Sequence, residues 1–253
     1  MVIPKLRAPI ILAHGLLGFN EVKLCGYRLA CYFPGIPELL NAAGNRAFVA
    51  TVSPTKGIAD RAAELKSFIN ENSPSEPVHL LAHSMGGLDA RYMISRLGMA
   101  DRVLSLTTLG TPHRGSSFAD WAISRLERFV KPLLDMFNLP YQAFYDLTTE
   151  KCRQFNEDVP DAPNVRYFSV AGRHPNGGWK SRFHLLHEFV RQTEGPNDGI
   201  VSLTSAKYGE SCNEWDGDHM SLVNWPDPTG PAPPPDRGPD YGRLLARLAD
   251  EGF

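Results

Sequence analysis

Five short apolar runs, separated by segments long enough for helices, most constrain how this chain of 253 residues can fold. The runs lack strict alternation of apolar and polar residues, as strands do when both faces of a sheet are covered. Amphipathic stretches at 37–43 and 58–72 fall between them, which is the rhythm of βαβ units. We therefore expect an α/β fold with a central, mostly parallel sheet and helices on both faces. The five runs cover residues 8–14, 48–52, 78–83, 103–110 and 165–172.

Length and composition indicate one domain over residues 1–253. Hydrophobic residues make up 42% of the chain and charged residues 21%, which is enough apolar material for a packed core. The net charge of −2 comes with scattered lysines and arginines, so no nucleic-acid partner is expected. The Pro-rich segment at 225–240 is predicted to be a surface loop before a final helix at 241–250.

The strongest chemical signal is HLLAHSMGGLDARYMISRL at 79–97, where an apolar strand runs into Ser84 and an amphipathic helix follows at once. Such a strand, sharp turn and helix hold a serine Oγ exposed above the sheet. The small residues Ala82 and Gly86 permit the turn. The pentapeptide alone suits a helix N-cap serine equally well, but its flanking elements favour a nucleophile.

A serine nucleophile requires a base and an acid that orients the base. In this kind of fold the chain order is Ser, Asp, His, with the histidine in a late loop. His219 in a polar loop is the candidate base, and Asp198 in GPNDGIVS is the candidate acid. Asp216 and Asp218 are rivals, but they stand too close to the histidine in sequence and are interpreted as solvated loop carboxylates.

Two backbone amides are candidates for an oxyanion hole, which holds the negative charge that develops on the carbonyl oxygen in acyl transfer. One is the N–H of Met85, directly after Ser84 at the start of a helix. The other is the N–H of Leu16 in the glycine-rich turn HGLLGF at 14–19. Both segments directly follow predicted strands.

A helical cap insertion is predicted at about 115–160, because apolar residues between 118 and 137 recur at helical spacing. Pro132 should kink or split this helix. We hypothesise that the cap covers the serine and contacts a lipid surface; an ordinary core-packing helix is the alternative. The residues predicted to bind substrate are Leu17, Trp121, Phe129 and Leu133.

Neither a metal ion nor a cofactor is predicted. His184 and His187 stand three apart on one predicted helical face, where lining a pocket, partial exposure and metal binding all remain open. The four cysteines show no C-x-x-C spacing, and whether Cys25 and Cys31 pair is left open; the others are Cys152 and Cys212.

The N-terminal segment has a short apolar run but no small-residue cleavage site, so it is interpreted as a strand rather than a secretion signal. No stretch reaches the ~18 apolar residues that a membrane-spanning helix needs. We expect a cytoplasmic protein, or a secreted one if a leader was removed.

Several motifs in this order resemble those of the bacterial triacylglycerol lipases of the true-lipase group from Pseudomonas and Burkholderia. They are HGLLGF, AHSMGGLDARY, TTLGTPHRGSSFADW, LTTEKCRQFNEDVP, NDGIVS and DHMSLVN, spread over residues 10–225. The resemblance implies the α/β-hydrolase fold, a catalytic triad of Ser84, Asp198 and His219, and oxyanion donors at Leu16 and Met85.

Two positions depart from that family. It places a calcium-binding Asp two residues after the catalytic histidine and a Gln four further on, where this chain has Ser221 and Trp225. Calcium is therefore not carried over. The region between Gly172 and Asp198 is also shorter than in those lipases.

The predicted function is that of a serine carboxylic-ester hydrolase acting on lipidic esters, in particular acylglycerols, through an acyl-enzyme on Ser84. An acyltransferase or thioesterase with the same triad is the first alternative, since acceptor choice depends on pocket shape. A lipid-binding module without catalysis is the second.

Overall fold

The computed structural model describes residues 3–18, 21–24, 27–129, 142–174, 183–226 and 236–253, with backbone alone at 21–24, 27–30 and 126–129. Cys25 and Leu133 therefore lie outside the described residues, as do Pro132 and the side chain of Phe129.

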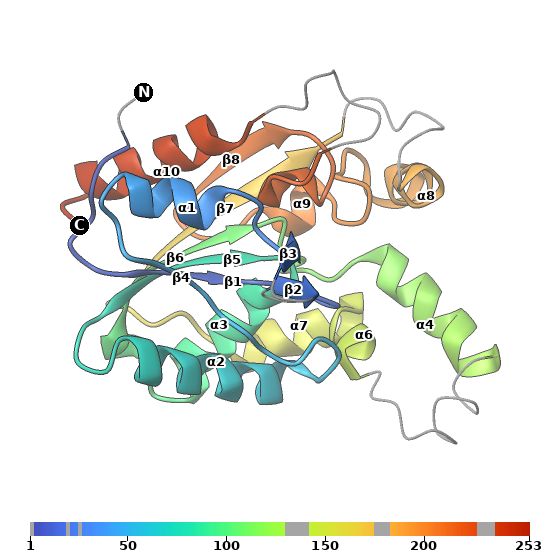
Figure 1. Cartoon of the computed structure of the whole chain (residues 1–253). Coiled ribbons are helices and arrows are strands. Elements are labelled where there is room, and N and C mark those ends of the chain that lie inside the picture. Colours follow the sequence, from blue (N-terminus) through green and yellow to red (C-terminus); the bar gives the residue numbers. More distant parts are fainter. Residues whose placement is uncertain (1–2, 19–20, 25–26, 130–141, 175–182, 227–235) are drawn as a thin grey trace.

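Six parallel strands form the central sheet in the order β4-β1-β5-β6-β7-β8 (Figure 1). The predicted mostly parallel sheet is confirmed, with strand ends shifted by a few residues: the run at 48–52 contributes only a three-residue strand. The strands are β1 (Ile10–Ala13), β4 (Ala47–Val49), β5 (Val78–His83), β6 (Val103–Leu109), β7 (Arg166–Arg173) and β8 (Ser211–Asp216).

Helices cover both faces of the sheet, and successive strand residues point to opposite faces. Ile10 and Leu12 of β1 join the core under α1 and α10, while Ile11 and Ala13 join the core under α2 and α3. Figure 1 shows these two helical layers above and below the sheet. The helices are α1 (Ile36–Ala42), α2 (Ile58–Asn72), α3 (Met85–Arg96) and α10 (Gly238–Asp250).

Two β-elements were not expected from the sequence. β8 at the sheet edge reads SCNEWD and buries only Trp215 fully, so it carries no apolar run. A separate antiparallel hairpin consists of β2 (Glu21–Leu24) and β3 (Tyr27–Cys31).

The carboxyl ends of parallel strands meet at one edge of a sheet, and the remaining helices gather beyond that edge here (Figure 1). Turns that follow β1, β5 and β7 therefore lie near one another. No helix in the described part of the chain combines the length and apolarity that crossing a bilayer requires. The helices at this edge are α4 (Ser117–Phe129), α6 (Gln142–Asp146), α7 (Thr149–Asp158), α8 (His184–Glu194), α9 (Leu203–Ala206) and the 3₁₀ turn η2 (Ser221–Val223); a further 3₁₀ turn, η1 (Ala100–Arg102), precedes β6.

Candidate active site

Ser84 sits at the tip of a sharp turn between β5 and α3. Its φ of 54° and ψ of −130° are strained for a residue with a side chain, a state that costs on the order of 1–3 kcal/mol and persists only where the surroundings enforce it. The Ser84 amide donates to Leu109 O at 2.9 Å, and Thr111 Oγ1 donates to Ser84 O at 2.7 Å. The turn also needs Gly86, because a Cβ there would lie 2.7 Å from His14 O.

His219 and Asp198 form one hydrogen-bonded unit. His219 Nδ1 lies 2.7 Å from Asp198 Oδ2, and the His219 amide donates to Asp198 O at 2.8 Å. The other carboxylate oxygen accepts from the amides of Ile200 at 3.1 Å and Val201 at 2.8 Å. An ionised Asp198 is an acceptor only, so Nδ1 carries the proton and Nε2 is the basic nitrogen.

The turn after β1 packs directly against the serine. A Cβ on Gly15 would lie 2.6 Å from Ser84 Cβ, so only glycine allows this approach. The next residue, Leu16, lines the same cavity as Ser84. Leu17 follows with a positive φ of 55°, its amide bonded to Pro54 O at 2.8 Å. Met85 follows the serine directly and begins α3.

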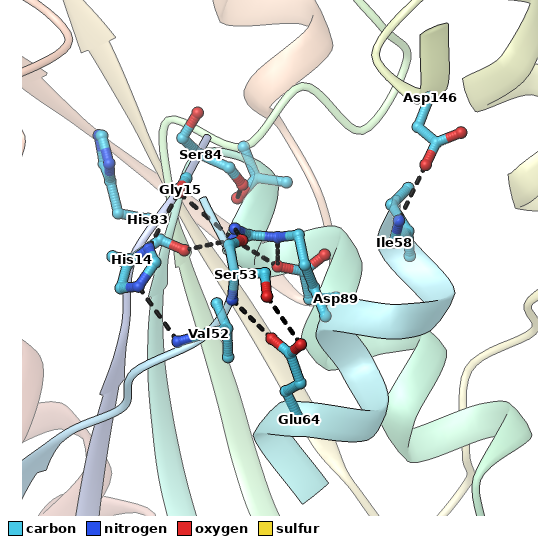
Figure 2. A network of polar contacts seen from close by, with 12 residues as sticks. His14, Gly15, Val52, Ser53, Ile58, Glu64, His83, Ser84, Asp89 and Asp146 are labelled. Atoms are coloured by element: carbon cyan, nitrogen blue, oxygen red, sulfur yellow. Dashed lines mark hydrogen bonds and ion pairs between the residues drawn. The ribbon is translucent and has the colours of Figure 1, made fainter. Parts of the chain in front are cut away.

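A buried ion pair holds this turn against the nucleophile helix. Arg61 of α2 is fully buried and lies 2.7 Å from Asp89 of α3. The same guanidinium donates to His14 O at 2.8 Å and to Gly15 O at 3.3 Å. Burial raises the pKa of Asp89, and the positive charge of Arg61 opposes that shift. Figure 2 shows Asp89, His14 and Gly15 around this point.

His14 completes the network in Figure 2. The Val52 amide donates to His14 Nε2 at 3.3 Å, so Nδ1 bears the proton and donates to Gly15 O at 3.0 Å. Burial lowers the pKa of His14 to about 4, which keeps the ring neutral near pH 7.

A second chain of hydrogen bonds joins this turn to the histidine loop. The Gly15 amide donates to Tyr32 Oη at 3.1 Å, Tyr32 Oη lies 2.8 Å from His83 Nδ1, and His83 Nε2 lies 2.9 Å from His219 O. Since a carbonyl only accepts, Nε2 of His83 is protonated and Nδ1 accepts from Tyr32. Burial, with His219 nearby, holds the pKa of His83 well below its usual value.

An apolar cavity of about 420 Å³ opens at these residues. The polar residues among those that line it are Ser84, His219, Tyr32 and Ser116. Of the residues predicted to bind substrate, Leu17 lines this cavity, whereas Trp121 is not among its lining residues and is 42% exposed. The apolar lining residues are Leu16, Leu17, Pro112, Phe118, Ala119, Phe144, Leu147, Phe183, Leu186, Ile200, Val201, Met220 and Trp225.

The other acidic and histidine residues that the sequence singled out have partners of their own. Asp216 pairs with Arg173 on the surface. Asp218 is fully buried and accepts the Ser221 amide at 2.7 Å, so its interpretation as a solvated carboxylate was wrong. His187 Nε2 lies 3.0 Å from a backbone carbonyl, which makes this nitrogen a donor and not a metal ligand.

Metal ligands do not cluster in the described residues, which include no group of three His, Cys, Asp or Glu side chains able to hold an ion. Cys152 and Cys212 carry free thiols. The pairing of Cys25 with Cys31 concerns a residue outside the described part of the chain.

Comparison with known proteins agrees with this geometry. The chain is 35% identical over 205 residues to triacylglycerol lipase 2 of Saccharomyces cerevisiae, an alignment that covers 77% of this chain and 62% of the yeast protein. It is 27% identical to a triacylglycerol lipase of Vibrio cholerae, covering 86% of this chain and 80% of that protein. The predicted resemblance to bacterial triacylglycerol lipases is thereby confirmed.

Solved structures support the same class. The mature form of the Bacillus licheniformis lipase BlEst2 superimposes with a TM-score of 0.74 at 25% identity, covering 94% of this chain and 91% of that one. The metagenomic carboxyl esterase MGS0156 has a TM-score of 0.75 at 16% identity, covering 96% and 76% of the two chains, and shows the shared fold.

The parallel sheet, the strained serine turn and the similar solved structures together define an α/β-hydrolase of the lipase and esterase class. Residues 56–209 match the PGAP1-like alpha/beta domain, and the chain belongs to that family.

Proposed function

We propose that this protein is a serine hydrolase that cleaves carboxylic esters of lipidic compounds, in particular acylglycerols. The observation that carries the proposal is that His219, bonded to the buried Asp198, lines the same apolar cavity as the strained Ser84. The triacylglycerol lipases among its relatives support the same substrate class.

The proposed reaction follows from the positions of the groups. His219 Nε2 takes the proton of Ser84 Oγ as the oxygen attacks the ester carbonyl, and Asp198 stabilises the resulting imidazolium. The amides of Leu16 and Met85 stabilise the oxyanion. The protonated His219 then gives its proton to the leaving alcohol, and an activated water releases the acid from the acyl-enzyme.

We propose further that residues 115–160 form a helical cap within a single domain. In support, Phe118 and Ala119 of α4, Phe144 of α6 and the adjoining Leu147 line the cavity from this segment. These side chains would bind the acyl chain, together with Leu17. Leu17, Trp121 and Leu185 are large apolar side chains that are 60%, 42% and 81% exposed, and a transient contact of these residues with a lipid surface is part of the proposal.

The test is the hydrolysis of p-nitrophenyl esters from short to long acyl chains by the parent and by Ser84→Ala. Ser75→Ala, on the exposed loop before β5, is the matched control. We expect the Ser84 variant to lose the activity, on the order of 10⁶-fold in kcat, as nucleophile removal does in serine hydrolases. A parent that hydrolyses no ester, or a Ser84→Ala variant that retains its rate, contradicts the proposal.

Acyl transfer is the competing outcome for the same triad. Adding a long-chain alcohol during ester cleavage separates the two activities, because a hydrolase releases mainly free acid while an acyltransferase releases mainly the new ester. The apolar character of the cavity favours lipidic acyl groups in either case.

A further inference from the structure

A buried guanidinium binds the loop that carries His219 on both sides of the histidine. Arg237, which directly precedes α10, is only 6% exposed. Its Nε donates to Ser221 O at 3.0 Å, and its Nη2 donates to Asp216 O and, at 3.2 Å, to Ser221 Oγ. Asp216 ends β8 and Ser221 begins η2, so His219 lies between the two anchored carbonyls.

The surroundings are shaped for this side chain. A Cβ on Gly217 would lie 2.5 Å from Arg237 Nη2 and 2.2 Å from Ser221 Oγ, and φ at Gly217 is 141°, so only glycine leaves room for the guanidinium. The remaining nitrogen, Nη1, pairs with Asp240 Oδ2 at 2.9 Å. The Arg237 amide also donates to Asn224 Oδ1 at 2.9 Å, at the far end of the loop.

The same loop does not fit the calcium site of the lipases that the sequence resembles. Calcium takes six to eight oxygen ligands, usually including carboxylates. Ser221 Oγ instead donates to Asp218 O at 2.7 Å, and Trp225 Nε1 donates to Tyr32 O at 2.9 Å. The carbonyl oxygens of Asp216 and Ser221 are occupied by Arg237.

We propose that Arg237 is the positioning residue for His219, an internal cation that fixes the loop of the base in place of a metal ion. The inference rests on the proposed function, in which His219 is the base. A guanidinium suits this role because it is permanently charged and its planar fork of N–H donors binds several oxygens in fixed directions. It keeps His219 Nδ1 on Asp198, and so keeps Nε2 directed at the cavity that contains Ser84.

Arg237→Ala and Arg237→Lys test the inference, with Arg243→Ala as the matched control. Arg243 binds the same Asp240 from the exposed side of α10 and does not contact the loop. We expect Arg237→Ala to lower kcat for a p-nitrophenyl ester by about 10²-fold, the cost of misplacing a catalytic group by about 1 Å, while KM changes little. Arg237→Lys, which keeps the charge but loses the fork, should also lose kcat, and Arg243→Ala should match the parent.

Millimolar ethylguanidinium separates positioning from a general loss of stability. It should restore part of the kcat of Arg237→Ala and none of that of Ser84→Ala. A folded Arg237→Ala variant with the kcat of the parent overturns the inference. A loss of kcat that is proportional to the loss of folded protein and that ethylguanidinium does not restore overturns it as well. Where Arg237→Ala is unfolded, a folded Arg237→Lys variant with full kcat overturns it equally.

A measurement without turnover separates failure of this inference from failure of the proposed function. The low-field proton resonance of His219 Nδ1–H reports its bond to Asp198 directly, and it should be present in the parent and lost or broadened in Arg237→Ala. An unchanged resonance overturns the positioning role even if no ester substrate is found. EDTA should leave the parent's rate unchanged, whereas a loss that calcium restores would assign the role to a metal ion.

Discussion

His219 is bonded twice to Asp198. The His219 amide donates to the backbone carbonyl of Asp198 at 2.8 Å, and His219 Nδ1 lies 2.7 Å from the Asp198 carboxylate. Backbone and side chain of the histidine are therefore fixed to the same residue. This double contact sets the direction of the ring, because the backbone bond positions the Cα and the side-chain bond selects the tautomer. The two residues act as a rigid unit although they belong to separate loops.

Asp198→Asn tests the carboxylate of this unit. An amide accepts the Ile200 and Val201 hydrogen bonds through its oxygen but presents an NH₂ group to His219 Nδ1, which selects the wrong tautomer. We expect kcat to fall by about 10³–10⁴-fold with little change in fold, as for the same change in other triads. Steady-state kinetics with Asp101→Asn, an exposed residue of η1, as control would check this, and a loss below about tenfold would remove Asp198 from the triad.

The ion pair of Arg61 and Asp89 is predicted to serve both stability and catalysis. Arg61→Met leaves a buried carboxylate without its partner and should lower the free energy of unfolding by about 3–5 kcal/mol. The double variant Arg61→Met/Asp89→Leu should regain most of that stability, since apolar replacements of buried ion pairs are often neutral. Its kcat should nevertheless stay about 10–10²-fold low, because His14 O and Gly15 O have lost the hydrogen bonds that Arg61 donates.

Urea unfolding and ester kinetics on the same three proteins measure both effects. A double variant that is stable and as active as the parent would show that the ion pair only supports the fold. A double variant as unstable as the single one would instead attribute the cost to lost packing of Arg61.

Ala119 tests which segment binds the acyl chain. It lies on α4, is 5% exposed and lines the cavity, so Ala119→Phe should fill part of that space. Each methylene excluded from the cavity costs about 0.8 kcal/mol, or roughly fourfold in kcat/KM, so the preferred p-nitrophenyl ester should become shorter. Ala122→Phe, on the same helix but not lining the cavity, should keep the parent's preference. Equal profiles for all three proteins would refute binding of the acyl chain by this segment.

Buried neutral histidines should make the fold sensitive to acid. His79 has no exposed surface, its Nδ1 lies 2.8 Å from Ser105 Oγ, and burial lowers its pKa from 6.5 to about 4. Between these two pKa values the unfolded chain binds a proton at His79 that the folded chain does not bind. The contribution of His79 to the free energy of unfolding is therefore complete above pH 6.5 and is lost as the pH falls toward 4. The largest contribution from this residue is on the order of 3 kcal/mol.

Urea unfolding between pH 7 and pH 4.5 measures that dependence. His79→Gln should flatten the slope of unfolding free energy against pH, because the residue no longer titrates. An unchanged slope would assign the acid sensitivity to other groups, first to His14, whose pKa is also about 4.

Local sequence determined the sheet and the serine turn. The run VHLLAH forms the buried strand β5, and the small residues Ala82 and Gly86 flank a serine that adopts the strained turn where the pattern predicted it. These features can be predicted from the sequence because a strand, a tight turn and a helix each have their own short-range pattern. The edge strand β8 was missed because only one of its side chains is buried, so periodicity gave no signal.

Tertiary structure alone decided how the candidate site is held together. Arg61 and Arg237 appear in the sequence as ordinary cations of amphipathic or loop segments, yet each is buried and binds backbone carbonyls of a loop that carries a proposed catalytic group. Tyr32 and His83 likewise join the turn after β1 to His219 through contacts between residues far apart in the chain. Such roles depend on which carbonyls and amides the packed sheet brings within hydrogen-bond distance, and no local pattern of residue types encodes that geometry.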